Sequence, residues 1–136
     1  FATSVSPWVV PLDALDHARV ALPEQQPSVL PYLRDDDAWC LDIHLKVNLN
    51  GTTVSRPPFA TQYWSPGQQL AHLTVNGASL RVGDLFASGT VTGPERDQRG
   101  SFLELSWGGR EPFTLNDGSV SAIDFSNGSS VYCEIS

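Results

Sequence analysis

The fold class is decided by the stretch LDIHLKVNLNGTTVS, residues 41–55. Apolar and polar residues alternate from 41 to 49, which is the pattern of a strand with one buried face. Asn50-Gly51 then gives a strong short-range signal for a hairpin turn. Residues 52–55 are therefore predicted to return antiparallel to the strand at 41–49.

The segment that follows predicts one helix. Ser65-Pro66-Gly67-Gln68 combines a favoured N-cap, a proline suited to the first helical position and a glutamine placed to complete a capping box. Asn76-Gly77 ends the pattern. We expect a prominent helix near residues 65–76.

The segments before residue 38 and after residue 79 show different patterns. Before residue 38, repeated prolines leave room only for short elements, such as one helical turn at 11–15. From Leu80 onward, turn residues separate apolar runs. These runs predict strands at 84–92, 101–107, 111–115, 119–125 and 130–135. The pattern alone gives a β-rich single domain over residues 1–136 with one capped helix.

Composition limits the function classes. A formal net charge of −7 disfavours nucleic-acid binding, and no apolar run reaches the length of a membrane span. Cys40 and Cys133 could form a disulfide, but two cysteines in a domain of this size favour reduced thiols. Together with the lack of a secretory signal, this predicts a cytoplasmic protein. The chain has no methionine and opens on Phe1, so we expect it to be part of a longer polypeptide.

The candidate functional residues lie between 88 and 107. Glu104 stands in the apolar run SFLELSW, where strand geometry would put it on one face with Phe102 and Ser106. A carboxylate among apolar neighbours could orient a histidine, or it could be a structural group bonded to backbone amides. Thr90, beside Gly89, could offer a hydroxyl to a ligand, or it could belong to a plain turn. The residues alone leave both alternatives open.

These motifs resemble the fumarylacetoacetase branch of the fumarylacetoacetate hydrolase family. The segment at 3–15 is similar to the family's TTVSPWVVPMDAL, the segment at 88–95 to SGTISGPE, and that at 101–107 to SMLELSW. The likeness runs in one order along nearly the whole chain. It covers only the carboxy-terminal portion of the family's catalytic domain.

The resemblance implies a fold, a reaction and a set of roles. The fold would be mainly β, a mixed β-sandwich roll, and the enzyme a homodimer. The reaction would be metal-dependent hydrolysis of a carbon–carbon bond in fumarylacetoacetate, yielding fumarate and acetoacetate in tyrosine and phenylalanine catabolism. Glu104 corresponds to the glutamate that orients a catalytic histidine, Thr90 to a substrate-binding threonine, and Thr3 to a threonine at the metal.

The resemblance also implies that most of the chemistry lies outside the chain. The other ligands of the divalent ion, Mg²⁺ or Ca²⁺, and the catalytic histidine itself belong to segments that precede Phe1. We therefore expect residues 1–136 alone to be inactive. Two alternatives remain: a hydrolase of another acylpyruvate or diketo acid, or a non-catalytic β-rich binding module anchored by Trp39, Tyr63 or Trp64.

Overall fold

A computed structural model describes residues 5–116, 118, 120–121 and 131–135. Within these residues the strands pair antiparallel in small sheets. The sheets are β1 (Arg19–Ala21) with β2 (Trp39–Leu41), β4 (Thr52–Ser55) with β3 (Leu45–Leu49) and β7 (Val131–Ile135), and β5 (Phe113–Thr114) with β6 (Val120–Ser121). The helices are short: the 3-10 helices η1 (Leu12–Ala18), η2 (Pro31–Leu33), η3 (Phe59–Thr61) and η4 (Arg96–Gln98), and the α-helices α1 (Pro66–Thr74) and α2 (Phe102–Leu105).

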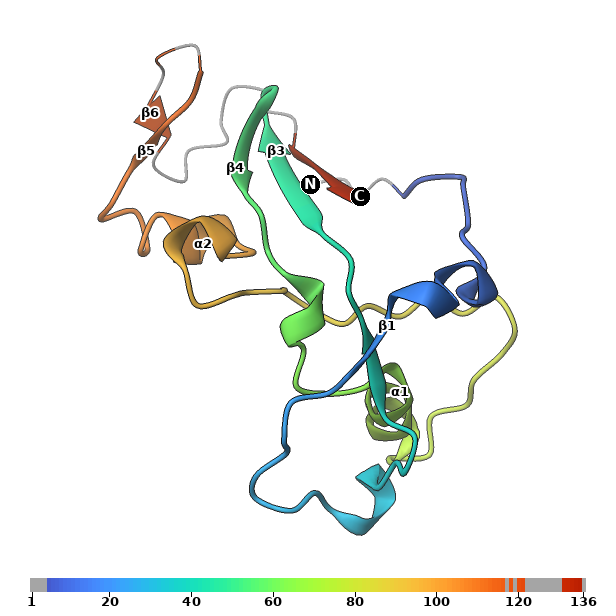
Figure 1. The fold of residues 1–136 in the computed structure, drawn as a ribbon. Coiled ribbons are helices and arrows are strands. Elements are labelled where there is room, and N and C mark those ends of the chain that lie inside the picture. Colours follow the sequence, from blue (N-terminus) through green and yellow to red (C-terminus); the bar gives the residue numbers. More distant parts are fainter. Residues whose placement is uncertain (1–4, 117, 119, 122–130, 136) are drawn as a thin grey trace.

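The predicted hairpin is confirmed. Asn50 and Gly51 have φ angles of 48° and 78°, the left-handed values that a tight two-residue hairpin turn requires. Leu49 then pairs with Thr52 as β4 returns along β3. Figure 1 shows β3 between β4 and β7, with α2, β5 and β6 beyond β4 and with α1 at the other end of the molecule.

The alternating run at 41–49 is not a single strand. The amide of Asp42 still bonds to the Ala18 carbonyl, at 2.7 Å, on the β1 side. His44 instead forms an isolated bridge with Pro58, and β3 begins only at Leu45. One run therefore serves two sheets, because the strand partner changes between residues 42 and 45.

The helix prediction is confirmed as well. Helix α1 begins after Ser65, whose hydroxyl accepts from the Gln68 amide at 3.0 Å while the Gln68 side chain accepts from the Ser65 amide at 3.0 Å. Both residues are buried, so the capping box lies inside the protein. The predicted turn at 11–15 is present as the longer η1.

Two strand predictions are wrong. Residues 84–92 carry no strand in the described structure, and residues 102–105 form helix α2. The runs at 111–115, 119–125 and 130–135 do contain β5, β6 and β7, which are shorter than expected, and residues 122–130 lie outside the described residues.

The buried core is small and runs from β2 through the hairpin to α2. The buried hydrophobic residues are Leu33, Cys40, Leu41, Val47, Leu49, Val91, Leu105 and Leu115. Small antiparallel sheets and short helices share this core, so the mainly-β expectation is met only in part. In the part of the chain that the structure describes, no helix is both long and apolar enough to span a membrane.

Candidate active site

Glu104 lies in the first turn of α2, where Ser101 is the N-cap. The Ser101 hydroxyl accepts from the Glu104 amide at 3.2 Å. Helical geometry separates neighbours that a strand would place together, so Leu105 and Ser106 are buried while Glu104 faces outward. The expectation that Phe102, Glu104 and Ser106 share one strand face is therefore wrong.

One oxygen of the Glu104 carboxylate is fixed by two hydroxyl groups. Oε2 accepts from the Thr92 hydroxyl at 2.8 Å and from the Ser101 hydroxyl at 3.1 Å. Among the described residues, no hydrogen bond reaches Oε1 and no cationic side chain forms an ion pair with Glu104. A carboxylate held in this way keeps one oxygen free to accept an N–H from another group.

Two segments of the chain meet at this carboxylate. Residues 91–93 run beside residues 98–101, and the Gly93 amide donates to the Gln98 carbonyl at 2.9 Å. A side chain on Gly100 would collide with the Val91 carbonyl oxygen. The close approach that lets Thr92 reach Glu104 therefore requires glycine at position 100.

The β3–β4 hairpin holds the segment at residues 98–101 in place. The buried Ser55 hydroxyl, at the end of β4, lies 2.6 Å from the Arg99 carbonyl and 3.1 Å from the Asp97 carbonyl. The Arg56 amide also donates to the Asp97 backbone carbonyl. The hairpin that the sequence predicts thereby positions the turn leading into α2.

Thr90 lies next to the same junction. It is exposed and follows Gly89, whose φ angle is 84°. The Thr90 methyl group is 3.0 Å from the point that a Cβ on Gly100 would occupy. Thr90 and Glu104 thus lie on either side of the place where residues 91–93 pass residues 98–101. Thr3 lies outside the described residues.

Arg99 binds the far end of α2 rather than the carboxylate. Its guanidinium donates to the Glu104 backbone carbonyl at 3.1 Å and lies 5.4 Å from the centre of the Trp107 ring. Trp107 has a φ angle of 49°, which turns the chain away from the helix. The positive charge of Arg99 is therefore used to hold the helix end.

The described residues do not make a metal site. No group of three His, Cys, Asp or Glu side chains with metal-binding geometry occurs among them. The Thr92 and Ser101 hydroxyls donate to Glu104 Oε2, so that oxygen carries two hydrogen bonds. The donor set at Glu104 consequently suits a hydrogen-bonding role.

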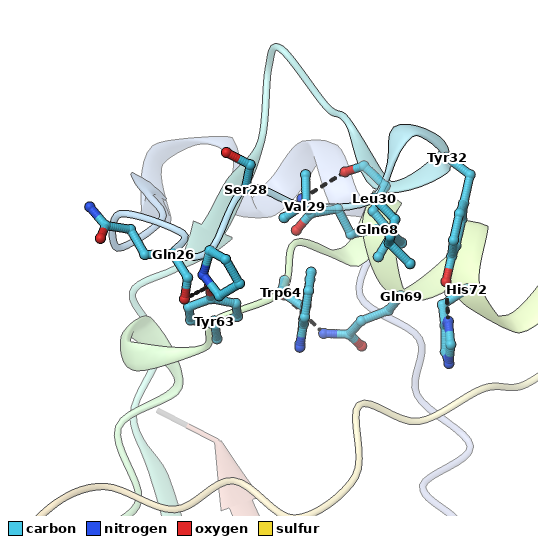
Figure 2. Close-up of a pocket in the computed structure, with 12 residues that line it drawn as sticks. Gln26, Ser28, Val29, Leu30, Tyr32, Tyr63, Trp64, Gln68, Gln69 and His72 are labelled. Carbon is cyan, nitrogen blue, oxygen red and sulfur yellow. Dashed lines mark hydrogen bonds between the residues drawn. The ribbon is translucent and has the colours of Figure 1, made fainter.

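A separate apolar groove lies beside α1. It has a volume of about 710 Å³, and Tyr63 and Trp64 line it together with His72, whose Nδ1 is 3.0 Å from the Tyr32 hydroxyl. Figure 2 shows these rings arranged around the groove. Trp39 lies elsewhere, with the Arg19 guanidinium 4.4 Å from its ring centre. Of the three anchors that the binding-module alternative invoked, the groove thus contains two.

Sequence reasoning missed Thr92 and Ser101. Ser101-Phe102-Leu103-Glu104 has the spacing of a capping box, which marks the start of a helix. That signal would have predicted α2 and the Ser101 contact with Glu104. The Thr92 contact carries no local signal, because it depends on how residues 93–99 turn the chain back.

Comparison with known proteins identifies relatives over most of the chain. The family model described as "Fumarylacetoacetate (FAA) hydrolase C-terminal" matches residues 1–132. The fumarylacetoacetase of Homo sapiens is 50% identical over 124 residues, which cover 87% of this chain and 30% of the relative.

Fumarylacetoacetases from other organisms match a similar share of the chain. The fumarylacetoacetase of Caenorhabditis elegans is 50% identical over 80% of this chain and 28% of the relative. That of Arabidopsis thaliana is 44% identical over 85% of this chain and 29% of the relative. The chain spans about 30% of the length of the curated relatives it matches.

Proposed function

This chain belongs to the fumarylacetoacetate hydrolase family, and we propose that it supplies the carboxy-terminal part of the catalytic domain of a fumarylacetoacetase-like enzyme. The relatives are about three times longer than the matched region. The activity proposed here therefore belongs to a complete catalytic domain to which these residues contribute. That complete domain would have the mixed β-sandwich roll that the resemblance implies.

The observation that carries the proposal is that, among the described residues, only one oxygen of the Glu104 carboxylate accepts hydrogen bonds. Its Oε2 is held by two hydroxyl groups, and its exposed side chain can present Oε1 to an imidazole N–H. A carboxylate in that position selects one histidine tautomer and stabilises the imidazolium that forms during proton transfer. Glu104 would therefore orient the base, and a histidine from the rest of the domain would take the proton.

The reaction proposed for that pair is the one that the family resemblance implies. The histidine removes a proton from water, and the resulting hydroxide adds to the carbonyl carbon on the fumaryl side of fumarylacetoacetate. The carbon–carbon bond then breaks, and its electron pair passes to the acetoacetate fragment, which gains a proton. The products are fumarate and acetoacetate. Thr90, beside the place where residues 91–93 pass residues 98–101, would bind the substrate through its hydroxyl group.

The remaining roles also rest on the family resemblance. We propose that a divalent ion, Mg²⁺ or Ca²⁺, binds to residues outside those described, with Thr3 beside it. The complete enzyme would be a homodimer acting in tyrosine and phenylalanine catabolism. The free, buried thiol of Cys40 suits a reducing compartment such as the cytoplasm.

A chimera tests the proposal. This chain would replace the matching region of human fumarylacetoacetase, and loss of fumarylacetoacetate would be followed spectroscopically. We expect turnover by the chimera and a fall in kcat of about 10²–10⁴-fold for Glu104→Gln, because the histidine loses its orienting carboxylate. Glu111→Gln is the matched control, since Glu111 pairs with Arg96 at 3.1 Å and does not contact Glu104.

The outcomes are distinct. A folded chimera without turnover, or one whose Glu104→Gln variant keeps full activity, would overturn the proposal. The 136-residue chain alone should show no turnover above a Glu104→Ala control. A panel of acylpyruvates and other diketo acids given to the chimera would show whether one of them is preferred to fumarylacetoacetate.

The groove beside α1 favours a second candidate function, that of a non-catalytic binding module. It places Tyr63 and the exposed Trp64 on an apolar surface. This alternative predicts that Trp64→Ala abolishes binding of the module's ligand or partner, while Glu104→Gln leaves that binding intact. The opposite result supports the hydrolase.

A further inference from the structure

Thr92 ties the Glu104 carboxylate to a different part of the chain. The other hydroxyl on Oε2 belongs to Ser101, which lies in the same helical turn as Glu104 and serves as its N-cap. Thr92 instead comes from the segment that carries Thr90. Its 2.8 Å bond is therefore the direct hydrogen bond, among the described residues, between this segment and the Glu104 side chain.

In that hydrogen bond the Thr92 hydroxyl donates, because a carboxylate oxygen accepts, and a second contact is consistent with this direction. The Gly100 amide donates to Thr92 Oγ1 at 3.2 Å, which uses the hydroxyl oxygen as an acceptor. The single hydroxyl proton is then free to point at Glu104 Oε2. Thr92 thus acts as a relay between a backbone amide and the carboxylate.

This relay matters because Glu104 is exposed. An exposed glutamate side chain ordinarily samples several rotamers, and holding it in one of them costs conformational entropy. Two hydrogen bonds from separate segments restrain the carboxylate without occupying Oε1. Small errors in the placement of a catalytic group reduce rates strongly.

We propose that Thr92 is a positioning residue, which holds the Glu104 carboxylate so that Oε1 faces the catalytic histidine. The proposal rests on the function proposed above. Loss of the Thr92 hydroxyl should therefore lower kcat and leave substrate binding unaffected, because Thr92 acts through Glu104.

The kinetic test uses the chimera with Thr92→Val and Thr92→Ser. Valine keeps the shape and removes the hydroxyl, so kcat should fall by about 10–100-fold while KM changes by less than about twofold. Serine restores the hydroxyl and should restore kcat to within about threefold of the wild type. Thr114→Val is the matched control, since Thr114 lies on β5 and is exposed. Unchanged kcat in Thr92→Val, or an effect on KM alone, would overturn the proposal.

A second measurement needs no activity. In nuclear magnetic resonance spectra of the chimera, Thr92→Val should speed hydrogen exchange of the Gly100 amide and shift the Glu104 side-chain carboxyl resonance. Thr92→Ser should leave both unchanged. An inactive chimera with this spectral pattern overturns the proposed function and supports the hydrogen-bond relay. Spectra that are the same in Thr92→Val and wild type overturn the relay even if the chimera is active.

Discussion

At the scale of single residues, Gly100 shows how closely the two segments of the candidate site approach. A Cβ at this position would collide with the Val91 carbonyl oxygen, which is backbone and cannot rotate away. Gly100→Ala should therefore destabilise the chain by about 2 kcal/mol, as overpacking commonly does. Urea unfolding measures the loss.

Gly67→Ala is the matched control for Gly100→Ala. A Cβ on Gly67 would lie 3.1 Å from Asp35 Oδ2, the end of a flexible side chain, and alanine favours the helix. Its free energy of unfolding should change by less than about 1 kcal/mol. Equal effects of the two substitutions would contradict the close approach described for Gly100.

Cys40 gives the chain a predictable pH dependence. Burial raises the pKa of the Cys40 thiol, and backbone hydrogen bonds from Leu41 and Gln62 offset part of that rise. The thiol ionises at lower pH in the unfolded chain than in the folded one, so its contribution to stability is complete below about pH 8.5 and is lost as the pH rises above it. The free energy of unfolding of the wild type should therefore approach that of Cys40→Ser as the pH rises from about 8.5 to about 10. A constant gap in urea unfolding would contradict this.

At the scale of elements, the capping box of α1 stabilises the end of the molecule that carries the groove. Ser65→Ala removes the cap and also the 2.9 Å bond from the Ser65 hydroxyl to Asp35. The expected loss is about 1–2 kcal/mol in urea unfolding. Ser79→Ala, at an exposed position outside the helix, should change stability by less than about 0.5 kcal/mol. A silent Ser65→Ala would mean that the capping box contributes nothing.

Local signals predicted some elements and missed others for a physical reason. The hairpin turn at Asn50-Gly51 and the cap at Ser65 are set by neighbouring residues, so the sequence sufficed. Leu103 and Leu105 alternate with Glu104 as in a strand, yet the Ser101 cap and four-residue helix prevail. Alternation over so few residues does not distinguish a strand from a helical turn.

The candidate site was predictable only in part for the same reason. Glu104 was found from its apolar setting and from the family motif. Its contact with Thr92 spans 12 positions and depends on Gly93, η4 and Gly100 bringing the chain back. Contacts that depend on a chain reversal have no signature in either of the segments that meet.

At the scale of the whole molecule, the exposed apolar residues predict self-association. Trp8 and Val9 are 86% and 87% exposed, Leu85 is 81% exposed, and Val82 is fully exposed. Apolar surface of this kind promotes association. Replacing Val82 and Leu85 with lysine should lower binding of a hydrophobic fluorescent dye and reduce the sedimentation-average mass.

The two lysines also lower the net negative charge, from −7 to −5, so the control adds the same two charges elsewhere. Asn76→Lys with Ser79→Lys changes exposed polar positions and leaves the apolar residues in place. Its dye binding should equal that of the wild type. Equal reductions in the two double variants would assign the effect to net charge.

The change of strand partner between residues 42 and 45 has a consequence for how the protein opens. The β1–β2 sheet and the β3–β4 hairpin share the buried core, but their main chains are joined only through this short bend and a few hydrogen bonds around it, so we expect fraying of one to disturb the strand pairing of the other little. Ser55 connects the turn before α2 to the hairpin, so we expect Glu104 to keep its position as long as the hairpin stays folded. Loss of the β1–β2 pairing would leave the hydrogen bond between Thr92 and Glu104 intact, whereas fraying of β4 would break it.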